Sequence, residues 1–157
     1  MEITYDDIAS LGVFSEFQRL SQRLFGLTLA VVSPDMTKTR VFGPPSDMNP
    51  FCLLLNSTSE GARRCHQCDR QRLLSAVAGK VPLQYECHAG LSEFLIPVVV
   101  DQRVVAVLQC GQVLNHPPNP SGWSRTAKSL AGWKGDLNAA RQRWFRTGII
   151  GRRSSGP

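Results

Sequence analysis

The hydrophobic positions near the N-terminus recur every three or four residues. They are Ile8, Leu11, Phe14, Phe17, Leu20 and Leu24, and polar residues stand between them. This spacing predicts an amphipathic helix from about Asp6 to Leu24, with Gly26 at its C-terminal end. Such a stripe most often packs against a sheet of its own domain. The alternative is contact with a second copy of the chain, as a dimer or signalling helix.

Further along, β-forming runs alternate with turn residues and helical stretches. Strands are expected at 27–33, 37–42, 82–86, 94–100 and 104–109, and helices at 50–55 and 62–78. The last two strands are joined by the hairpin loop 101–103 and are apolar almost throughout, so they should be central strands, covered on both faces or facing a cavity. The order of elements predicts an α+β fold: an antiparallel sheet of about five strands packed with helices, and an N-terminal helix leading in.

The composition changes after Asn115. The chain has 157 residues and a net charge of +6, yet residues 1–115 hold ten Lys or Arg against eleven Asp or Glu. The excess charge lies in 116–157, where Pro, Gly, Arg and Trp are frequent. We therefore expect one domain over 1–115 and a basic tail over 116–157, part helical near 128–145 and disordered at its end. The charge gives residues 1–115 no reason to bind nucleic acid, although the tail could bind it without sequence preference.

The sequence has no signal peptide at its start and no apolar run long enough to cross a membrane. We expect a cytoplasmic protein with no membrane partner. Its five cysteines, an odd number, would then be reduced, which favours metal binding, redox sensing or burial over a disulfide framework.

The cysteines could form one chemical site. Four of them, with the spacing C-x12-C-x2-C-x18-C, are Cys52, Cys65, Cys68 and Cys87. Four thiolates can hold zinc tetrahedrally, and the same set could hold an iron-containing centre or act as an oxidisable pair. Arg63, Arg64 and a nearby helix start would favour thiolates at Cys65 and Cys68. Packing of buried thiols is the remaining interpretation, and it is the one expected for Cys110.

The stretch around these cysteines resembles a known family. Its signature residues are Phe51-Cys52, Gly61, Cys65-x-x-Cys68-Asp69, Tyr85, Cys87-His88-Ala-Gly90-Leu91, Ile96-Pro97 and Gly111-Gln112-Val113. In this order they resemble the PocR sensory domain, over roughly Ile8 to Asn115. The resemblance implies a PAS-like module that senses small hydrocarbon derivatives such as diols, found ahead of helix-turn-helix regulators of the AraC type and in sensor histidine kinases. Such modules are normally followed by an output domain, which we expect to be absent from this chain because an atypical basic segment takes its place.

The same stretch offers polar and aromatic side chains for a pocket that binds a neutral, mostly apolar ligand. The candidates are Tyr85, His88, Phe94, Gln109 and Gln112. The glutamines could pair with ligand hydroxyls, although Gln112 could equally satisfy backbone groups at a strand end. His88 could instead bind a metal. The sequence holds no catalytic motif, and adjacent Cys87 and His88 would face opposite sides of a strand, so we expect no enzyme.

The leading hypothesis is a PAS-like sensory domain of bacterial signal transduction or transcription regulation. It would bind a small organic ligand between sheet and helices, and its four-cysteine cluster would be a structural or sensing site. The alternative is a metal- or redox-responsive regulator in which the cysteines themselves are the input. Either signal could reach a partner through the N-terminal helix, for example in a homodimer.

Overall fold

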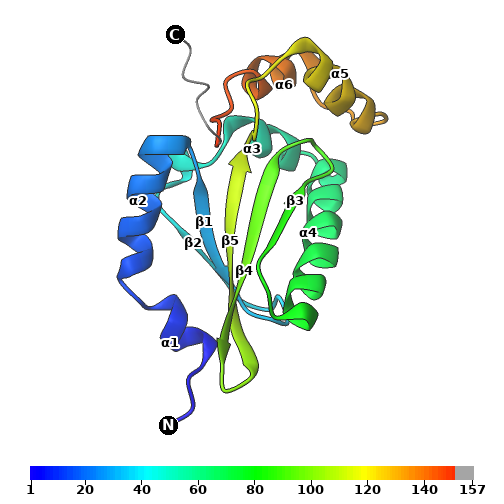
Figure 1. Ribbon diagram of the computed structural model, residues 1–157. Helices are drawn as coiled ribbons and strands as arrows, with labels where there is room; N and C mark the ends of the chain where they lie inside the picture. The colour runs from blue at the N-terminus through cyan, green and yellow to red at the C-terminus, as the bar shows by residue number, and fades with distance from the viewer. Residues whose placement is uncertain (151–157) are drawn as a thin grey trace.

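An antiparallel sheet of five strands forms the centre of the computed structural model, which describes residues 1–150 (Figure 1). The strands are β1 (Thr28–Val32), β2 (Thr39–Phe42), β3 (Leu83–Glu86), β4 (Ser92–Val100) and β5 (Arg103–Val113). Their spatial order is β2-β1-β5-β4-β3, so the two most apolar strands, β4 and β5, lie inside the sheet. This confirms the predicted α+β class and the central position of these strands.

The β4–β5 hairpin closes with a two-residue loop. Asp101 and Gln102 have φ angles of 47° and 64°, and Val100 pairs with Arg103 across the turn. Two successive residues with positive φ are typical of a type I′ turn, whose twist matches that of the flanking strands. The predicted hairpin is confirmed, with a loop one residue shorter than expected.

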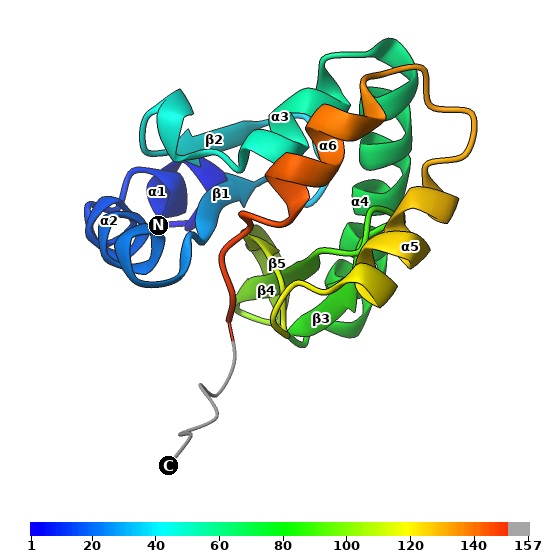
Figure 2. The same ribbon diagram turned by 90° about the horizontal axis from the view of Figure 1, so that it is seen from above.

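Helices cover both faces of the sheet. They are α1 (Tyr5–Ala9), α2 (Val13–Phe25), α3 (Pro50–Asn56), α4 (Ser59–Gly79), α5 (Pro120–Ser129) and α6 (Leu137–Trp144), with a 3-10 turn η1 at Pro45–Asp47. Figure 2 shows α1 and α2 on one face and α4 on the other, in agreement with their contacts. Strand alternation separates the two cores, because Val31 packs with the α1 side and Val32 with the α4 side. No helix within residues 1–150 combines the length and the apolar character that crossing a bilayer requires.

The N-terminal helix differs from its prediction, since the chain bends at residues 10–12 and forms two helices instead of one. The short α1 still packs on the sheet: Ala9 is buried, and the Tyr5 hydroxyl donates to the carbonyl of Val31 (3.0 Å). The bend includes Gly12, a residue with low helix propensity that the apolar periodicity overlooks. The two helices therefore take separate orientations.

Helix α2 turns a polar side toward the sheet. Its buried residues are Gln18 and Ser21, and Gln18 donates a hydrogen bond to Asp47 (2.8 Å). Phe14, at the start of the stripe, packs against Phe42 with ring centres 5.8 Å apart, whereas the rest of the stripe points outward, with 47% of Phe17, 52% of Leu20 and 71% of Leu24 exposed. The expectation that this whole stripe packs on its own sheet is therefore wrong for α2.

The segment after Asn115 packs onto the same fold. Helix α6 lies over α3 and contacts α5, which lies to the side of α3 (Figure 2), and all three tryptophans join the core that these helices cover. Trp144 is 1% exposed, and the indole N–H of Trp133 donates to Thr58 at the start of α4 (2.8 Å). The helix expected near 128–145 is confirmed as α6, whereas α5, which precedes it, was not expected. The tail end expected to be disordered falls on 151–157, outside the described residues.

We predict that Trp144→Ala lowers the free energy of unfolding by about 3 to 5 kcal/mol, because it empties a fully buried aromatic site. Leu137→Ala, in the same helix but 46% exposed, should change it by less than about 1 kcal/mol. Urea denaturation followed by circular dichroism measures both. Equal, small effects would show that α6 is dispensable to the core.

Candidate functional site

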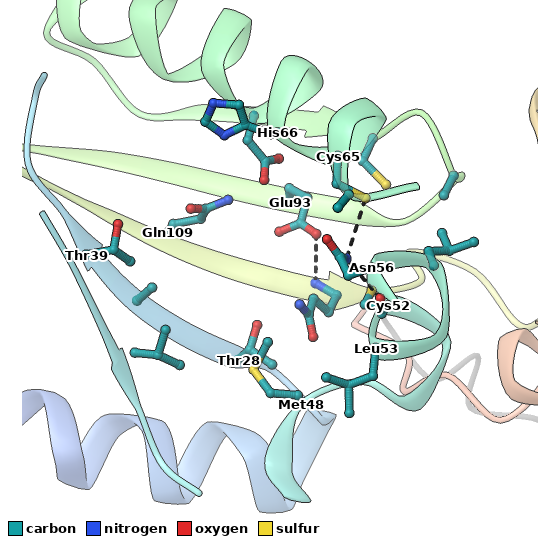
Figure 3. Close-up of a pocket in the computed structure, with 18 of the residues that line it drawn as sticks. Thr28, Thr39, Met48, Cys52, Leu53, Asn56, Cys65, His66, Glu93 and Gln109 are labelled. Carbon is teal, nitrogen blue, oxygen red and sulfur yellow. Dashed lines mark hydrogen bonds between the residues drawn. The ribbon is translucent and has the colours of Figure 1, made fainter. Parts of the chain in front are cut away.

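A cavity of about 390 Å³ lies between the sheet and helices α3 and α4 (Figure 3). This volume is in the range of small-molecule sites. The sheet contributes Thr28, Leu29, Ala30, Thr39, Val41, Glu93, Gln109 and Gln112; α3 and the turn before it contribute Met48, Cys52, Leu53, Leu55 and Asn56; α4 contributes Ala62, Cys65, His66 and Asp69; and the loop before β4 contributes Cys87, His88 and Ala89. Of these twenty residues eight are aliphatic or Met, three are Cys and nine are polar, and none is Phe, Tyr, Trp, Lys or Arg.

Glu93 occupies a seat that the sheet builds for it. The side chain is 8% exposed, and its Oε1 accepts the backbone N–H of Gln112 (3.2 Å). Its Oε2 fills the place where a side chain at position 111 would begin, because a Cβ on Gly111 would overlap it. The register shifts here, so that Ser92 pairs with Val113 and Glu93 with Gly111, which leaves Gln112 as an extra residue. This bulge turns the Gln112 N–H toward the carboxyl.

Gln112 also ties the bulge to α3. Its side-chain Oε1 accepts the backbone N–H of Asn49 (2.9 Å), and its carbonyl accepts the Asn49 side-chain amide (2.8 Å). Asn49 in turn caps α3, since its Oδ1 accepts the N–H of Phe51 (2.8 Å). The seat of Glu93 and the start of the helix above the cavity are one hydrogen-bonded unit.

Asp69, on α4, is the second carboxyl of the cavity wall. The Tyr85 hydroxyl donates to its Oδ1 (3.1 Å), and the Arg72 guanidinium lies over the Tyr85 ring, 5.5 Å from its centre. Burial raises the pKa of Asp69, while hydrogen bonds from Tyr85 and Gln109 lower it in part. Tyr85 does not line the cavity. Its role is to orient Asp69 from behind the wall.

Among the described residues of the lining no Lys or Arg pairs with these carboxyls, and the charge of His66 lowers the pKa of Asp69 only in part. Burial raises the pKa of Glu93 well above its ordinary value, and the negative charge of Asp69 raises it further, against a smaller lowering by the Gln112 N–H. Arg64, on the same helix as Asp69, turns away to Glu60 (2.7 Å) and to the carbonyl of Ala131 (2.9 Å). Glu93 therefore keeps its proton to a higher pH than an exposed carboxyl does.

The predicted four-cysteine set is spread over the cavity wall. Cys65 lies 3.2 Å from Nε2 of His88, and Cys52 and Cys87 also line the cavity, whereas Cys68 packs toward the core under α4. Within residues 1–150, no three His, Cys, Asp or Glu side chains are placed to hold one metal ion. These residues do not fit a zinc or iron centre as they stand.

The thiols are also less acidic than the sequence suggested. Burial raises the pKa of Cys65 to about 11, and burial is likewise the largest cause of the raised pKa of Cys68. The expected lowering by Arg63 and Arg64 fails because both pair with Glu60 (3.1 and 2.7 Å). Cys65 is moreover the seventh residue of α4, beyond the first turn where a helix N-terminus acts.

Of the residues predicted for the pocket, His88, Gln109 and Gln112 line the cavity. Tyr85 stands behind it, and Phe94 does not line it. Phe94 lies on the opposite face, where it packs toward the α1 and α2 core and borders a separate apolar hollow. Neighbouring residues of a strand point to opposite faces, so Glu93 and Phe94 cannot both serve one pocket.

Sequence reasoning did not select Asp69 and Glu93 as site residues. Glu93 is the one charged residue between Leu91 and Val100, and it directly precedes the run 94–100 that was assigned to a central strand. A lone charge beside such a run was the available signal, because a buried charge needs a partner or a purpose. Asp69 stands directly after the second cysteine of the CxxC.

Comparison with known proteins gives two matches. A family model described as the sensory domain found in PocR matches residues 7–146. The Regulatory protein PocR of Salmonella typhimurium, strain LT2, is 39% identical over 67 residues, which make up 43% of this chain. The matched part covers 22% of that relative's own length. The family match extends past residue 115 and includes helices α5 and α6.

We predict that Gly111→Ala displaces the Glu93 carboxyl and lowers the free energy of unfolding by about 1 to 3 kcal/mol, because the added methyl overpacks the seat. Gly79→Ala is the control, since a Cβ there meets only the Val81 side chain, at 3.6 Å. In a Glu93→Ala background most of the overlap is gone, so the same Gly111→Ala change should have a smaller effect. Denaturant unfolding of the four variants measures this coupling, and additive effects would contradict the proposed seat.

Proposed function

The chain belongs to the PocR sensory-domain family, and on this basis we propose that it is a ligand-sensing domain of bacterial signal transduction or transcription regulation. The observation that carries the proposal is the cavity of about 390 Å³ between the sheet, α3 and α4. Its lining combines aliphatic side chains with polar groups that converge on the same space, as the lining of a small-molecule site does. The ligand would be a small hydrocarbon derivative, such as a diol.

We propose that Glu93 and Gln109 are its principal polar contacts. Both project from the sheet into the cavity, on the side of α4 (Figure 3). Gln109 offers an amide donor and an acceptor, and Glu93 offers carboxyl oxygens or, while protonated, a donor. A ligand hydroxyl that pairs with them would replace the water they otherwise face.

The route from ligand to output would begin at Gln112. Its hydrogen bonds to Glu93 and Asn49 link the cavity floor to the cap of α3. A ligand shifts a protein between states only by binding one of them better, so contacts that depend on α3 closing over the cavity would bias its position. The relative is a regulatory protein, and we propose that this domain signals to an output domain or partner chain.

The cavity is better suited to binding than to catalysis. A Cys and His pair acts as a nucleophile when the thiol ionises readily. Burial instead raises the pKa of Cys65, which lies 3.2 Å from His88, to about 11. All five cysteines are free thiols, which suits a reducing cytoplasm.

A second candidate function makes these thiols the input. The contact between Cys65 and His88 favours it, because an oxidant that reached the cavity would meet Cys65 beside a group able to take its proton. In this case the domain would respond to redox state, and replacing Cys65 would abolish the response.

We also propose that the domain pairs with a second copy through α2. The exposed stripe of Phe17, Leu20 and Leu24 lies beside an apolar hollow that includes Phe94 and Ile96 and has no charged residue in its lining. Glu16 and Arg23, seven residues apart, flank the stripe on one side. Antiparallel α2 helices related by a two-fold axis would place Glu16 of each copy opposite Arg23 of the other, so the face is complementary to itself in charge.

We predict that at least one of a panel of short diols and related small alcohols raises the melting temperature, by about 5 °C or more at about 100 times its dissociation constant. Gln109→Leu should remove most of this shift, because it deletes a polar contact in the cavity. Gln84→Leu, an exposed residue of β3 outside the cavity, should leave it intact. Differential scanning fluorimetry makes the measurement.

A flat response across the panel would count against the ligand-sensing proposal. The double variant Cys65→Ser with Cys68→Ser separates the two candidates. A sensor of organic ligands keeps its thermal shift in this variant, whereas a redox sensor loses an oxidant-dependent change in melting temperature and shows no ligand-dependent one.

For the dimer, we predict that Leu20→Glu weakens self-association at least about 10-fold by placing a charge in the apolar face. Arg19→Gln changes the net charge equally but lies off the stripe, and should have little effect. Analytical ultracentrifugation measures both. Glu16→Arg and Arg23→Glu should each weaken the dimer, and their combination should restore it. A monomeric wild-type chain, or failure of this rescue, would exclude the antiparallel pairing.

A further inference from the structure

The charges that face the cavity are unbalanced. Its titratable groups are Cys65, His66 and Asp69 from α4, Cys52 from α3, Cys87 and His88 from the loop, and Glu93 from β4. Two are carboxyls, and none of the lining residues is Lys or Arg. Of the arginines nearby, Arg64 donates to Glu60 and Ala131, and Arg72 stacks on Tyr85. His66 is exposed at the edge of the site (Figure 3).

The Glu93 carboxyl is held in place, but its hydrogen bonding is incomplete. More than nine-tenths of the residue is buried, and its Oε1 is fixed by the Gln112 N–H. Among the described residues no donor reaches Oε2, which rests in the hollow left by Gly111 on the cavity floor. A carboxylate with its charge has room for several donors, so this group can accept more than the protein supplies.

Glu93 is buried and Asp69 half-buried, and among the lining residues the charge of His66, at the exposed edge, acts on Asp69 but no Lys or Arg pairs with either carboxyl, which destabilises the empty site. A buried charge is tolerated when it is paired, and otherwise the group takes up a proton. A neutral diol would leave this imbalance of charge in place. A site for a diol also needs no carboxyl, because uncharged amides bind hydroxyls equally well. A ligand that brings its own positive charge removes the imbalance.

We propose that the ligand is a small aliphatic amine, such as an amino alcohol, whose ammonium group binds between Glu93 and Asp69. This inference rests on the proposed sensing function and specifies the ligand class of the same cavity. The hydroxyl of an amino alcohol would pair with Gln109, and its short carbon chain would contact the aliphatic lining. The lining has no Phe, Tyr or Trp to stack on a cation, so recognition depends on N–H donors, which primary amines have and quaternary ammonium ions lack.

Proton balance distinguishes the two ligand classes. In the empty site, burial and the charge of Asp69 raise the pKa of Glu93, which favours a proton on this carboxyl in the cavity floor. An ammonium replaces that proton, which is released to solvent, so amine affinity should rise with pH until the amine itself loses its charge. A diol binds without releasing a proton, and its affinity should not change with pH over the same range.

The test uses three molecules with one carbon skeleton: 1-aminopropan-2-ol, propane-1,2-diol and lactate. Isothermal titration calorimetry at about pH 7, in two buffers with different ionisation enthalpies, gives affinity and proton release together. We expect the amino alcohol to bind at least about 10-fold more tightly than the diol, with the release of up to one proton. Lactate should bind most weakly, because its carboxylate would face Glu93 and Asp69.

Glu93→Gln is the decisive variant, since it keeps shape and hydrogen bonding but removes the charge. It should weaken the amino alcohol at least about 10-fold and abolish proton release, and it should weaken the diol less than the amino alcohol because the Gln amide still hydrogen-bonds a hydroxyl. Glu86→Gln, an exposed residue of β3 outside the cavity, is the matched control and should change neither ligand. Circular dichroism melts establish that both variants fold.

The outcomes separate this inference from the function on which it rests. Diol binding as tight as or tighter than amine binding, or an unaffected Glu93→Gln variant, would overturn the amine assignment and leave the sensing function standing. Tightest binding of lactate would do the same. If none of the three molecules binds and the broader alcohol panel also gives no thermal shift, both proposals fall.

Discussion

The Glu93 carboxyl beneath the cavity is the interaction on which the rest of the site depends. It needs three things at once: a hollow where residue 111 has no side chain, an N–H turned inward at residue 112, and a register shift that brings both to the same point. Gln112 accepts a positive φ of 61° to provide that N–H. A non-glycine residue in this region of backbone space is strained, and here the hydrogen bonds to Glu93 and Asn49 hold it there. The Gly-Gln pair is therefore a structural device for seating a buried acid.

The backbone of the fold could be predicted from the sequence because its signals are local. Apolar runs on either side of Asp101 and Gln102 indicate a hairpin, and Asn49 before Pro50 suits the start of α3. The orientation of α2 could not be predicted in this way. An apolar stripe shows that one side of a helix is to be covered, but it does not show which element or partner covers it. The core position of Trp133 and Trp144 was missed for a related reason. Each lies in or beside a short helix, and what joins them is contact with α3 rather than a period along the chain.

The candidate site was predictable in part. The glutamines and His88 were selected for their chemistry, and they do line the cavity. Phe94 was selected for its size, but strand alternation gives the cavity to its neighbour, so a shift of one residue separates a site residue from a core residue. The thiolate prediction failed in a different way. It counted Arg63 and Arg64 as neighbours in sequence, yet Glu60 binds both arginines, and burial then controls the acidity of Cys65.

The same alternation offers a physical link between ligand and partner. Glu93 and Phe94 are consecutive in β4, one facing the cavity and the other the apolar hollow beside α2. A ligand that draws the Glu93 side chain upward acts on a peptide unit shared with Phe94, and both faces are packed closely enough that small shifts are transmitted. Such coupling has a limit, since a ligand moves the equilibrium only by its difference in affinity for the two arrangements. A neutral ligand that leaves the carboxyl pair protonated changes little at Glu93, whereas a cation that replaces the proton changes its charge and its contacts together. Strand β4 is therefore best suited to respond to a ligand whose binding changes the charge of Glu93.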